Sequence, residues 1–276
     1  MNVRDPLAWQ DALAQVPGAA AAADLSVQPL SGGTSNATFR VRTREGVFVV
    51  RLHAPHALDL GVDRAREVAL HEAAAGAGLA SRILAADPGG RFLVTEFLEG
   101  APWQARDLED DTRLGALAQT LCELHALAAP VVPALDLPRL LEGHVAHLAA
   151  RDAALGQGLR LKLARAQDIL SRQADAGRRT CIVHGDLSHG NMIGTGAPRL
   201  IDWEYAAVGD PLTDLACLAA YYPRVLAHGA ALLELSGVSP AASVSDLAQL
   251  AWVYRWLSDL WSQRLALARC HPSPAH

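Results

Sequence analysis

The chain has 276 residues, of which 51% are hydrophobic, and this is enough for one large domain or two lobes with a substantial core. A formal net charge of −5 and a pI near 6.1 give no general basic surface, so a nucleic-acid partner is not expected. No apolar run has the length that crosses a bilayer, which predicts a cytoplasmic protein without membrane insertion.

The first hundred residues are predicted to be rich in strands. A short helix over residues 5–16 ends at Pro17-Gly18, and three strands with two turns follow between residues 26 and 52. Apolar residues at helical spacing predict a helix over 63–75. Two more strands are expected around the turn at Pro88-Gly89-Gly90.

The rest of the chain is predicted to be mainly helical. Apolar stripes at helical spacing mark six helices, over residues 110–128, 137–150, 159–174, 212–222, 224–235 and 244–269. Between the third and the fourth of these lie two short apolar runs of β character, Cys181 to Val183 and a second run that ends at Asp202.

Polar side chains are concentrated around these two runs. His184, Asp186 and Asn191 follow the first run, and Asp202 ends the second. Because polar groups at strand ends need a chemical or capping reason, the stretch predicts a functional site. Carboxylate and amide oxygens are suitable ligands for Mg²⁺, which usually shares one or two carboxylates with the phosphates of a substrate.

This stretch resembles a known phosphotransferase motif. His184-Gly185-Asp186, Asn191 and the run IDWEY from Ile201 to Tyr205 are similar to the motif of the aminoglycoside phosphotransferase and choline kinase families. IDWEYA with the following GDP and DLA is similar to the choline/ethanolamine kinase and bacterial thiamine kinase branch in particular. The resemblance implies an α+β, two-lobed, protein-kinase-like fold. Residues 1–98 would form the nucleotide-binding lobe with five strands, and 99–276 the helical lobe that binds the acceptor.

The resemblance also implies catalytic roles. Asp186 would accept or orient the proton of the substrate hydroxyl, since catalysis of phosphoryl transfer depends on positioning and charge neutralisation. His184 would hold the loop by hydrogen bonds, and Asp214 would hold the backbone of that loop. The alternative for Asp186 is a loop carboxylate that only caps a helix.

Three residues are predicted metal ligands. Asn191 and Asp202 would hold Mg²⁺ together with the ATP phosphates. Glu204, where the choline kinase branch usually has an acid, would join the shell of a second metal. The alternative for Glu204 is a surface carboxylate that pairs with an arginine.

The cation expected on the nucleotide phosphates is an arginine. The only lysine, Lys162, lies in the helical part, whereas Arg51 stands on the third predicted strand. Its expected partner is Glu67, with Glu72 as the fallback, because five residues along a helix only one of them can face Arg51. The alternative for Arg51 is an exposed charge on an alternating strand.

Two further segments are assigned to the nucleotide by the resemblance. The run SGGTSN lies between the first two strands, and Thr34, Ser35 and Asn36 are expected to cover the phosphates. The backbone of the segment from Glu96 to Leu98 would bind adenine. There is no Walker A sequence, which argues against a P-loop kinase.

The acceptor site is predicted on the last helix. Trp252, Trp256 and Asp259 offer aromatic and acidic groups that suit a quaternary ammonium or thiazolium cation. The alternative is a helix whose tryptophans only pack in the core.

The predicted function is therefore an ATP- and Mg²⁺-dependent kinase for a hydroxyl of a small cationic molecule of the choline, ethanolamine or thiamine type. An aminoglycoside or sugar kinase is the alternative enzyme. A kinase-like protein that binds a ligand without catalysis is the alternative outside enzymes.

Overall fold

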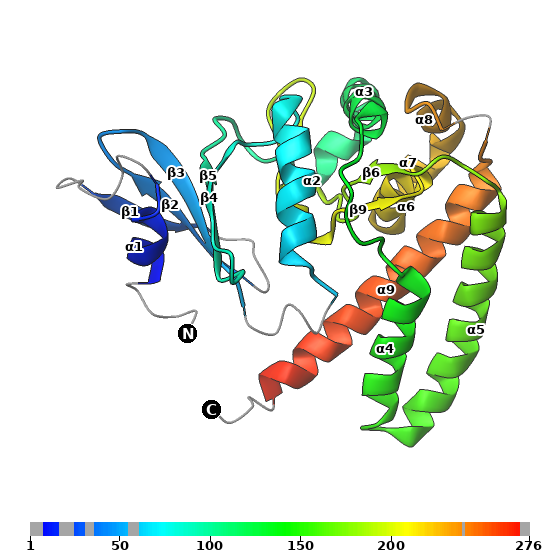
Figure 1. The fold of residues 1–276 in the computed structure, drawn as a ribbon. Helices are drawn as coiled ribbons and strands as arrows, with labels where there is room; N and C mark the ends of the chain where they lie inside the picture. The colour runs from blue at the N-terminus through cyan, green and yellow to red at the C-terminus, as the bar shows by residue number, and fades with distance from the viewer. Residues whose placement is uncertain (1–7, 17–24, 31–35, 55–60, 239–240, 271–276) are drawn as a thin grey trace.

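The computed structural model describes residues 8–16, 25–30, 36–54, 61–238 and 241–270. An antiparallel sheet in the N-terminal part precedes a mainly helical remainder, and Figure 1 shows the two parts beside each other. The predicted α+β class, with five strands in the N-terminal part and a mainly helical remainder, is confirmed. None of the helices in the described ranges has the length and apolar character needed to cross a membrane.

The sheet has five strands in the order β1-β2-β3-β5-β4, and neighbouring strands are antiparallel. The bounds are β1 Ser26–Leu30, β2 Ala37–Arg42, β3 Val47–Leu52, β4 Ile83–Ala86 and β5 Phe92–Glu96. One face is covered by α1 (Ala8–Leu13), whose Trp9 packs with Val41 and Val50 of the sheet. Arg51 thus stands on the central strand, opposite Thr38 and Leu93.

Helix α2 (Arg64–Gly76) joins the two parts of the molecule. It begins at Asp63, whose side chain accepts hydrogen bonds from the N–H groups of Ala65 and Arg66, a standard N-cap. Leu70 and Ala74, although they belong to the N-terminal part, are buried in the core of the helical part. The helix is therefore anchored in the core of the helical part.

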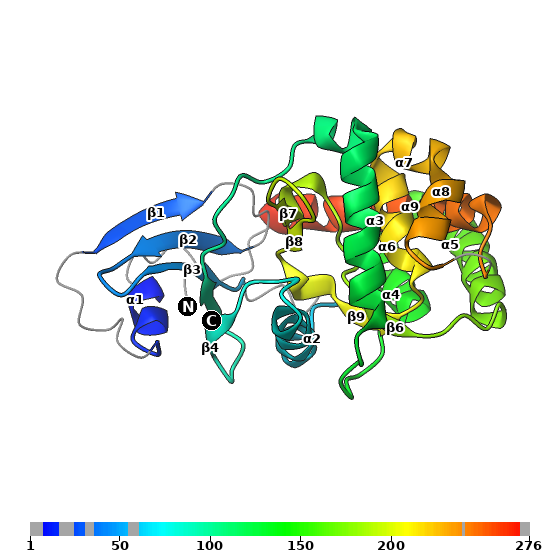
Figure 2. The ribbon, with the colours of Figure 1, turned by 90° about the horizontal axis from the view of Figure 1, so that it is seen from above.

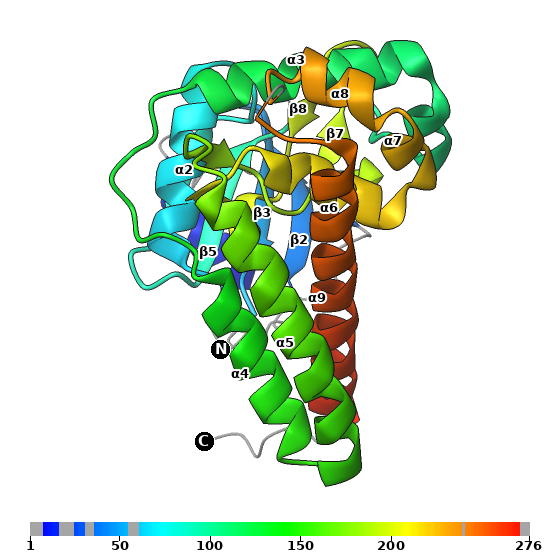
Figure 3. The same cartoon turned by 90° about the vertical axis from the view of Figure 1, so that its right-hand side faces the viewer.

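The helical part contains α3 to α9. Their bounds are α3 Asp111–Ala126, α4 Leu137–Ala149, α5 Ala153–Asp175, α6 Leu212–Tyr221, α7 Pro223–Ala227, α8 Gly229–Leu235 and α9 Val244–Cys270. Helices α4, α5 and α9 run side by side, as Figure 3 shows, and α6 packs on α9. Their leucines form one continuous core with those of α3.

Four short strands lie where α2, α3 and α6 meet. They are β6 Cys181–Val183, β7 Met192–Ile193, β8 Arg199–Leu200 and β9 Ala207–Gly209, and they form the antiparallel pairs β6-β9 and β7-β8. Figure 2 shows β7 and β8 between the large sheet and α3, and β6 and β9 beside α2 and α3. The polar loop from His184 to Asn191 connects β6 to β7.

Two helices differ from the prediction. The single helix expected over 224–235 is wrong, because α7 and α8 are separated at His228-Gly229. Gly229 is buried so close to α9 that a Cβ would lie 3.2 Å from Leu247, and the chain changes direction there. Helix α5 begins at Ala153 rather than near 159, since Asp152 caps it despite the glycines in its first turns.

Candidate active site

The second residue of the polar loop is Gly185, and any other residue there would be strained. Gly185 has a φ of +75°, and a Cβ built there would lie 2.6 Å from the carbonyl oxygen of Tyr205. This conformation turns the chain immediately after β6, so that the next residue, Asp186, faces the space between the two parts of the molecule.

Asp214 of α6 holds the backbone of this loop. Its fully buried carboxylate accepts hydrogen bonds from the N–H groups of His184 (3.1 Å) and Gly185 (2.9 Å). His125 of α3 donates a third bond from Nε2 at 2.9 Å. His125 was not predicted as a site residue from the sequence. A histidine on the mostly apolar, leucine-rich face of α3 could have indicated it.

His184 is a structural residue by its surroundings. Its ring is completely buried, Nε2 donates to the carbonyl oxygen of Ile201 at 2.9 Å, and the ring packs edge-on against Trp203. Burial lowers the pKa of His184, against the opposing effects of Asp214 and of the bond to Ile201. A neutral ring with no exposure does not act as a general base toward a ligand.

Asp186 and Asn191 are brought together. The Asn191 side-chain amide donates to the Asp186 backbone carbonyl at 2.8 Å and to its carboxylate at 3.3 Å. Burial, together with the nearby carboxylates of Asp202 and Glu204, raises the pKa of Asp186 to about 7, although the Asn191 bond lowers it. A carboxyl group that titrates near neutral pH is suited to exchange a proton with a hydroxyl.

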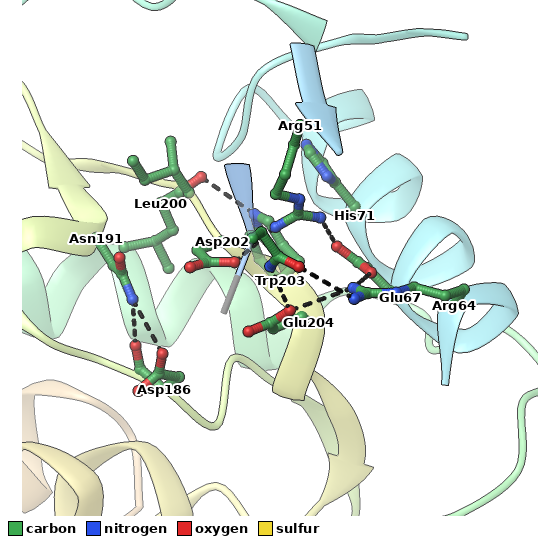
Figure 4. A network of polar contacts seen from close by, with 12 residues as sticks. Arg51, Arg64, Glu67, His71, Asp186, Asn191, Leu200, Asp202, Trp203 and Glu204 are labelled. Carbon is green, nitrogen blue, oxygen red and sulfur yellow. Dashed lines mark hydrogen bonds and ion pairs between the residues drawn. The ribbon is translucent and has the colours of Figure 1, made fainter. Parts of the chain in front are cut away.

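Asp202 has an unusual backbone conformation. Its φ of 66° and ψ of 66° are left-handed, and it is the only non-glycine residue with positive φ in the described ranges. Such strain is typical of functional sites, where surrounding contacts maintain it. Arg51 donates to the Asp202 carboxylate at 2.6 Å and also forms an ion pair with Glu67. Glu67, rather than Glu72, therefore faces Arg51 (Figure 4).

A second arginine extends this network. Arg64 donates to Glu67 at 2.7 Å and to Glu204 at 3.2 Å, and Figure 4 shows it between the two carboxylates. The sequence analysis missed Arg64, although its spacing of three residues from Glu67 on α2 was visible.

Glu204 is consequently occupied by protein contacts. The same Glu204 oxygen that binds Arg64 accepts a 2.8 Å hydrogen bond from the Asn36 amide. Glu204 thus pairs with an arginine, as the alternative interpretation had it, but at 5% exposure it is a buried residue rather than a surface one.

Of the other residues predicted to bind the nucleotide, some lie near the cavity and others do not. Asn36 lies in the network just described and also accepts from the N–H of Ala54. Thr34 and Ser35 lie outside the described residues. The side chain of Glu96 points to Arg82 at the surface, while Leu98 is buried.

A cavity of about 290 Å³ connects these groups with the helices. Its sheet side consists of Asn36, Thr38 and Arg51. Its middle is formed by the polar loop and the segment around Asp202, including Asp186, Ser188, Asn191, Glu204 and Tyr205. Its helix side consists of Leu140, His144, Cys217, Tyr221, Tyr254, Leu257, Ser258 and Trp261.

The predicted acceptor residues Trp252, Trp256 and Asp259 are not among the residues that line this cavity. Trp252 and Trp256 stack on each other with ring centroids 5.9 Å apart, and Arg165 lies 4.2 Å from the centroid of Trp252. Asp259 is exposed to solvent. Helix α9 turns a different face to the cavity, so the aromatic pair serves the packing of α5 against α9.

The described part of the chain holds no cluster of three or more His, Cys, Asp or Glu side chains that could bind a metal. The candidate metal ligands Asn191 and Asp202 both line the cavity and offer an amide and a carboxylate oxygen. These donors fit a hard cation that takes its remaining ligands from phosphates and water.

Comparison with models of protein families shows which family the chain belongs to. The model of the phosphotransferase enzyme family matches residues 26–242, and the protein therefore belongs to that family. It is an enzyme of the kinase class, as the motif around Asp186 predicted, and the alternative of a non-catalytic binding protein is set aside. No curated protein sequence matches this chain.

Solved structures with the same fold come from two kinds of kinase. A choline/ethanolamine kinase family protein from Mesorhizobium loti is 22% identical, with a TM-score of 0.74 over 97% of this chain and 88% of that chain. The choline kinase LicA from Streptococcus pneumoniae is 19% identical, with a TM-score of 0.72 over 91% and 88% of the two chains. A gentamicin complex of the aminoglycoside phosphotransferase APH(2'')-IIa is 17% identical, with a TM-score of 0.68 over 95% and 93%.

Proposed function

We propose that this enzyme transfers the terminal phosphoryl group of ATP to a hydroxyl of a small molecule, with Mg²⁺ as cofactor. The observation that carries the proposal is that one cavity is lined by Arg51, Asp186, Asn191 and Asp202 together. Phosphoryl transfer needs a cation on the phosphates, metal ligands and a group that positions the acceptor hydroxyl, and these four residues supply all three.

The middle of the cavity would carry the chemistry. Asp186 accepts the proton of the acceptor hydroxyl or orients that hydroxyl toward the phosphorus atom, and its raised pKa of about 7 suits this exchange. Asn191 holds the Asp186 carboxylate in place by its 3.3 Å contact. Asn191 and Asp202 would hold Mg²⁺, which, when bound, neutralises charge on the phosphates. Glu204 is assigned to Arg64 and Asn36 in this proposal, because both hold its Oε2 oxygen.

The sheet side would bind the nucleotide. Arg51 is held between Glu67 and Asp202, so its guanidinium is in place to bind phosphate oxygens once the metal takes the Asp202 carboxylate. Asn36, with Thr34 and Ser35 before it, would cover the phosphates. The N–H groups of Glu96 and Phe97 donate to Arg82 and Val47, so the adenine contact would come from the backbone that follows, at Leu98.

The acceptor is proposed to be a small molecule with a cationic group. Four aromatic side chains, Tyr205, Tyr221, Tyr254 and Trp261, line the cavity, and aromatic faces attract organic cations. The fold shared with the choline kinase LicA and with a choline/ethanolamine kinase family protein is compatible with this class, while the gentamicin complex of APH(2'')-IIa keeps an aminoglycoside as the alternative. The cytoplasm is the proposed location.

A substrate panel tests this proposal. The full chain is incubated with ATP and Mg²⁺ and with choline, ethanolamine, thiamine or kanamycin, and ADP release is followed. Turnover that requires both Mg²⁺ and one of the first three alcohols supports the proposal. Turnover with kanamycin alone would replace the cationic small alcohol by an aminoglycoside, and no turnover above the acceptor-free rate would reject the proposed acceptors altogether.

A further inference from the structure

One histidine in the wall of the cavity has no role in the mechanism above. His144 of α4 lines the helix side, one turn beyond Leu140, and only 1% of its surface is exposed. A polar ring that is so deeply buried needs hydrogen-bond partners, because an unpaired buried polar group costs free energy.

One ring nitrogen of His144 has its partner on α9. The guanidinium of Arg264 lies 3.2 Å from Nδ1 of His144. A guanidinium has only donors, so Nδ1 must be the unprotonated nitrogen that accepts. Burial first, and then the charges of Arg264 and His147, lowers the pKa of His144 to about 4. The ring is therefore neutral at neutral pH, and its proton is on Nε2.

The other ring nitrogen of His144, Nε2, is a hydrogen-bond donor without an acceptor among the described residues. Among the residues that the structure describes, none accepts a hydrogen bond from Nε2 of His144, while the ring itself forms part of the cavity wall. The tautomer is thus fixed from behind by Arg264, and the free N–H is left for a molecule that enters the cavity.

We infer that His144 binds the acceptor substrate, by donating its Nε2 hydrogen bond to a second, uncharged accepting atom besides the hydroxyl that is phosphorylated. The inference rests on the proposed kinase function and narrows its acceptor. Such an atom is a ring nitrogen, an ether oxygen or another hydroxyl. The charge of Arg264 behind the ring also disfavours a compact ammonium group against this part of the wall.

The consequence is a choice among acceptor classes. Thiamine has uncharged ring nitrogens and a diffuse cation, and it meets both requirements. Choline and ethanolamine carry no accepting atom besides the reacting hydroxyl, so His144 would remain unpaired when either of them binds. A site whose buried donor is left unpaired rejects such a molecule strongly. Thiamine-like acceptors are therefore expected to be preferred over choline and ethanolamine.

Substitutions of His144 test the inference. Steady-state kinetics of the full chain with ATP, Mg²⁺ and either thiamine or choline give the acceptor KM and kcat for each variant. His144→Leu removes the donor and is expected to raise the thiamine KM about tenfold, with the ATP KM unchanged. His144→Gln places an amide N–H near the position of Nε2 and should restore most of the affinity, whereas His144→Asn, whose amide reaches only to the position of Nδ1, should not.

The control is His147→Leu, the same change three residues further along α4 at a residue that does not line the cavity. It should leave the thiamine KM at the wild-type value. Equal KM values for His144→Leu and wild type, or a wild-type preference for choline over thiamine, would overturn the inference while leaving the kinase proposal intact. No ADP release with any acceptor in the panel would reject the proposed acceptors and this inference together.

Discussion

The sheet side and the helix side of the cavity are built from different chemistry. On the sheet side, arginines and carboxylates alternate in direct contact: Glu67 binds both Arg51 and Arg64, which in turn reach Asp202 and Glu204. On the helix side, the lining is aromatic and apolar, with His144 as its most deeply buried polar residue.

The difference matches what each side is proposed to bind. Phosphates have the same charge and shape in every nucleotide, so a fixed array of paired charges is suited to them. Acceptor alcohols vary in shape and charge, and a wall of aromatic rings with few polar groups discriminates among them by contact and by the rare hydrogen bond. The predictions below test whether the two sides act separately.

The largest effect is expected where the two sides meet. Asp186→Asn removes the proton acceptor but keeps the size of the side chain, and we expect kcat to fall about 10²- to 10⁴-fold, as for loss of a general base. The ATP KM should change little, because Asp186 is not proposed to bind phosphate. ADP release at saturating ATP measures this.

The melting temperature of Asp186→Asn tests whether this variant is folded. Because the surroundings of the half-buried Asp186 raise its pKa to about 7, a neutral amide in its place should not lower the melting temperature. Full activity of Asp186→Asn would show that the motif does not carry the chemistry.

Removal of Arg51 should act on the sheet side alone. Arg51→Met is expected to raise the ATP KM roughly 10- to 100-fold, which corresponds to about 1.5–3 kcal/mol for a hydrogen bond with a charged group. The acceptor KM should not follow. The substitution also leaves Glu67 and Asp202 without this partner and should destabilise the fold by up to about 3–5 kcal/mol.

A double variant separates the two effects of Arg51. Arg51→Met with Glu67→Gln removes the buried pair as a whole, so stability in urea should recover in part while the ATP KM stays high. An ATP KM that recovers together with stability would mean that Arg51 serves only the fold.

Protonation of His71 should weaken the contact between α2 and Trp203, the residue that follows Asp202. His71 stacks on Trp203 and donates from Nε2 to the Ser81 carbonyl at 2.8 Å, and burial is the main cause that lowers its pKa to about 4. The unfolded chain takes up this proton near pH 6.5, but the folded chain only near pH 4. The contribution to stability is therefore complete above pH 6.5 and is lost as the pH falls toward 4, by about 3 kcal/mol in all.

The comparison with His71→Gln isolates this histidine from the others. Glutamine keeps a donor for Ser81 but does not titrate, so its free energy of unfolding should fall less between pH 6.5 and pH 4 than that of the wild type. Chemical unfolding at several pH values gives the difference. Parallel curves for the two proteins would show that His71 is protonated in the folded state as easily as in the unfolded one.

The sequence predicted the sheet side and the middle of the site far better than the helix side. Asp186, Asn191 and Asp202 lie in one short stretch, so their spacing carries a recognisable pattern. Glu67 was expected to pair with Arg51 because the family that this pattern resembles pairs a cation on the third strand with a glutamate on the following helix. Arg64 was missed, since an arginine in the first turn of a helix has many possible partners, and only the folded chain brings Glu204 to it.

The helix side depends on rotations of helices that sequence periodicity does not fix. Trp252 and Trp256 share a face of α9 with the right chemistry for a cation, but that face packs on neighbouring helices. The residues that line the cavity come from α4, α6 and α9, which are far apart along the chain. Likewise, His144 carries no local pattern that distinguishes it from a core residue.

The smallest predicted effect concerns a contact between Tyr222, at the end of α6, and the polar loop from His184 to Asn191. The Tyr222 hydroxyl, at the end of α6, accepts a hydrogen bond from the N–H of His189 at 3.1 Å and donates to Nδ1 of the same residue at 2.7 Å. His189 lies between Asp186 and Asn191, so this contact positions the loop rather than a ligand. Tyr222→Phe should lower kcat about tenfold, near the 1–1.5 kcal/mol of one hydrogen bond, with the ATP KM unchanged.

A double-mutant cycle with His189→Ala decides whether Tyr222 acts through this contact. If it does, the double variant loses no more kcat than Tyr222→Phe alone, because His189→Ala removes only the bond to Nδ1, whereas Tyr222→Phe removes that bond and the bond from the His189 backbone N–H. Additive losses would mean that Tyr222 and His189 act independently. Tyr222 would then have no part in holding Asp186 through His189, while the Asp214 carboxylate would still hold the backbone at the start of the loop.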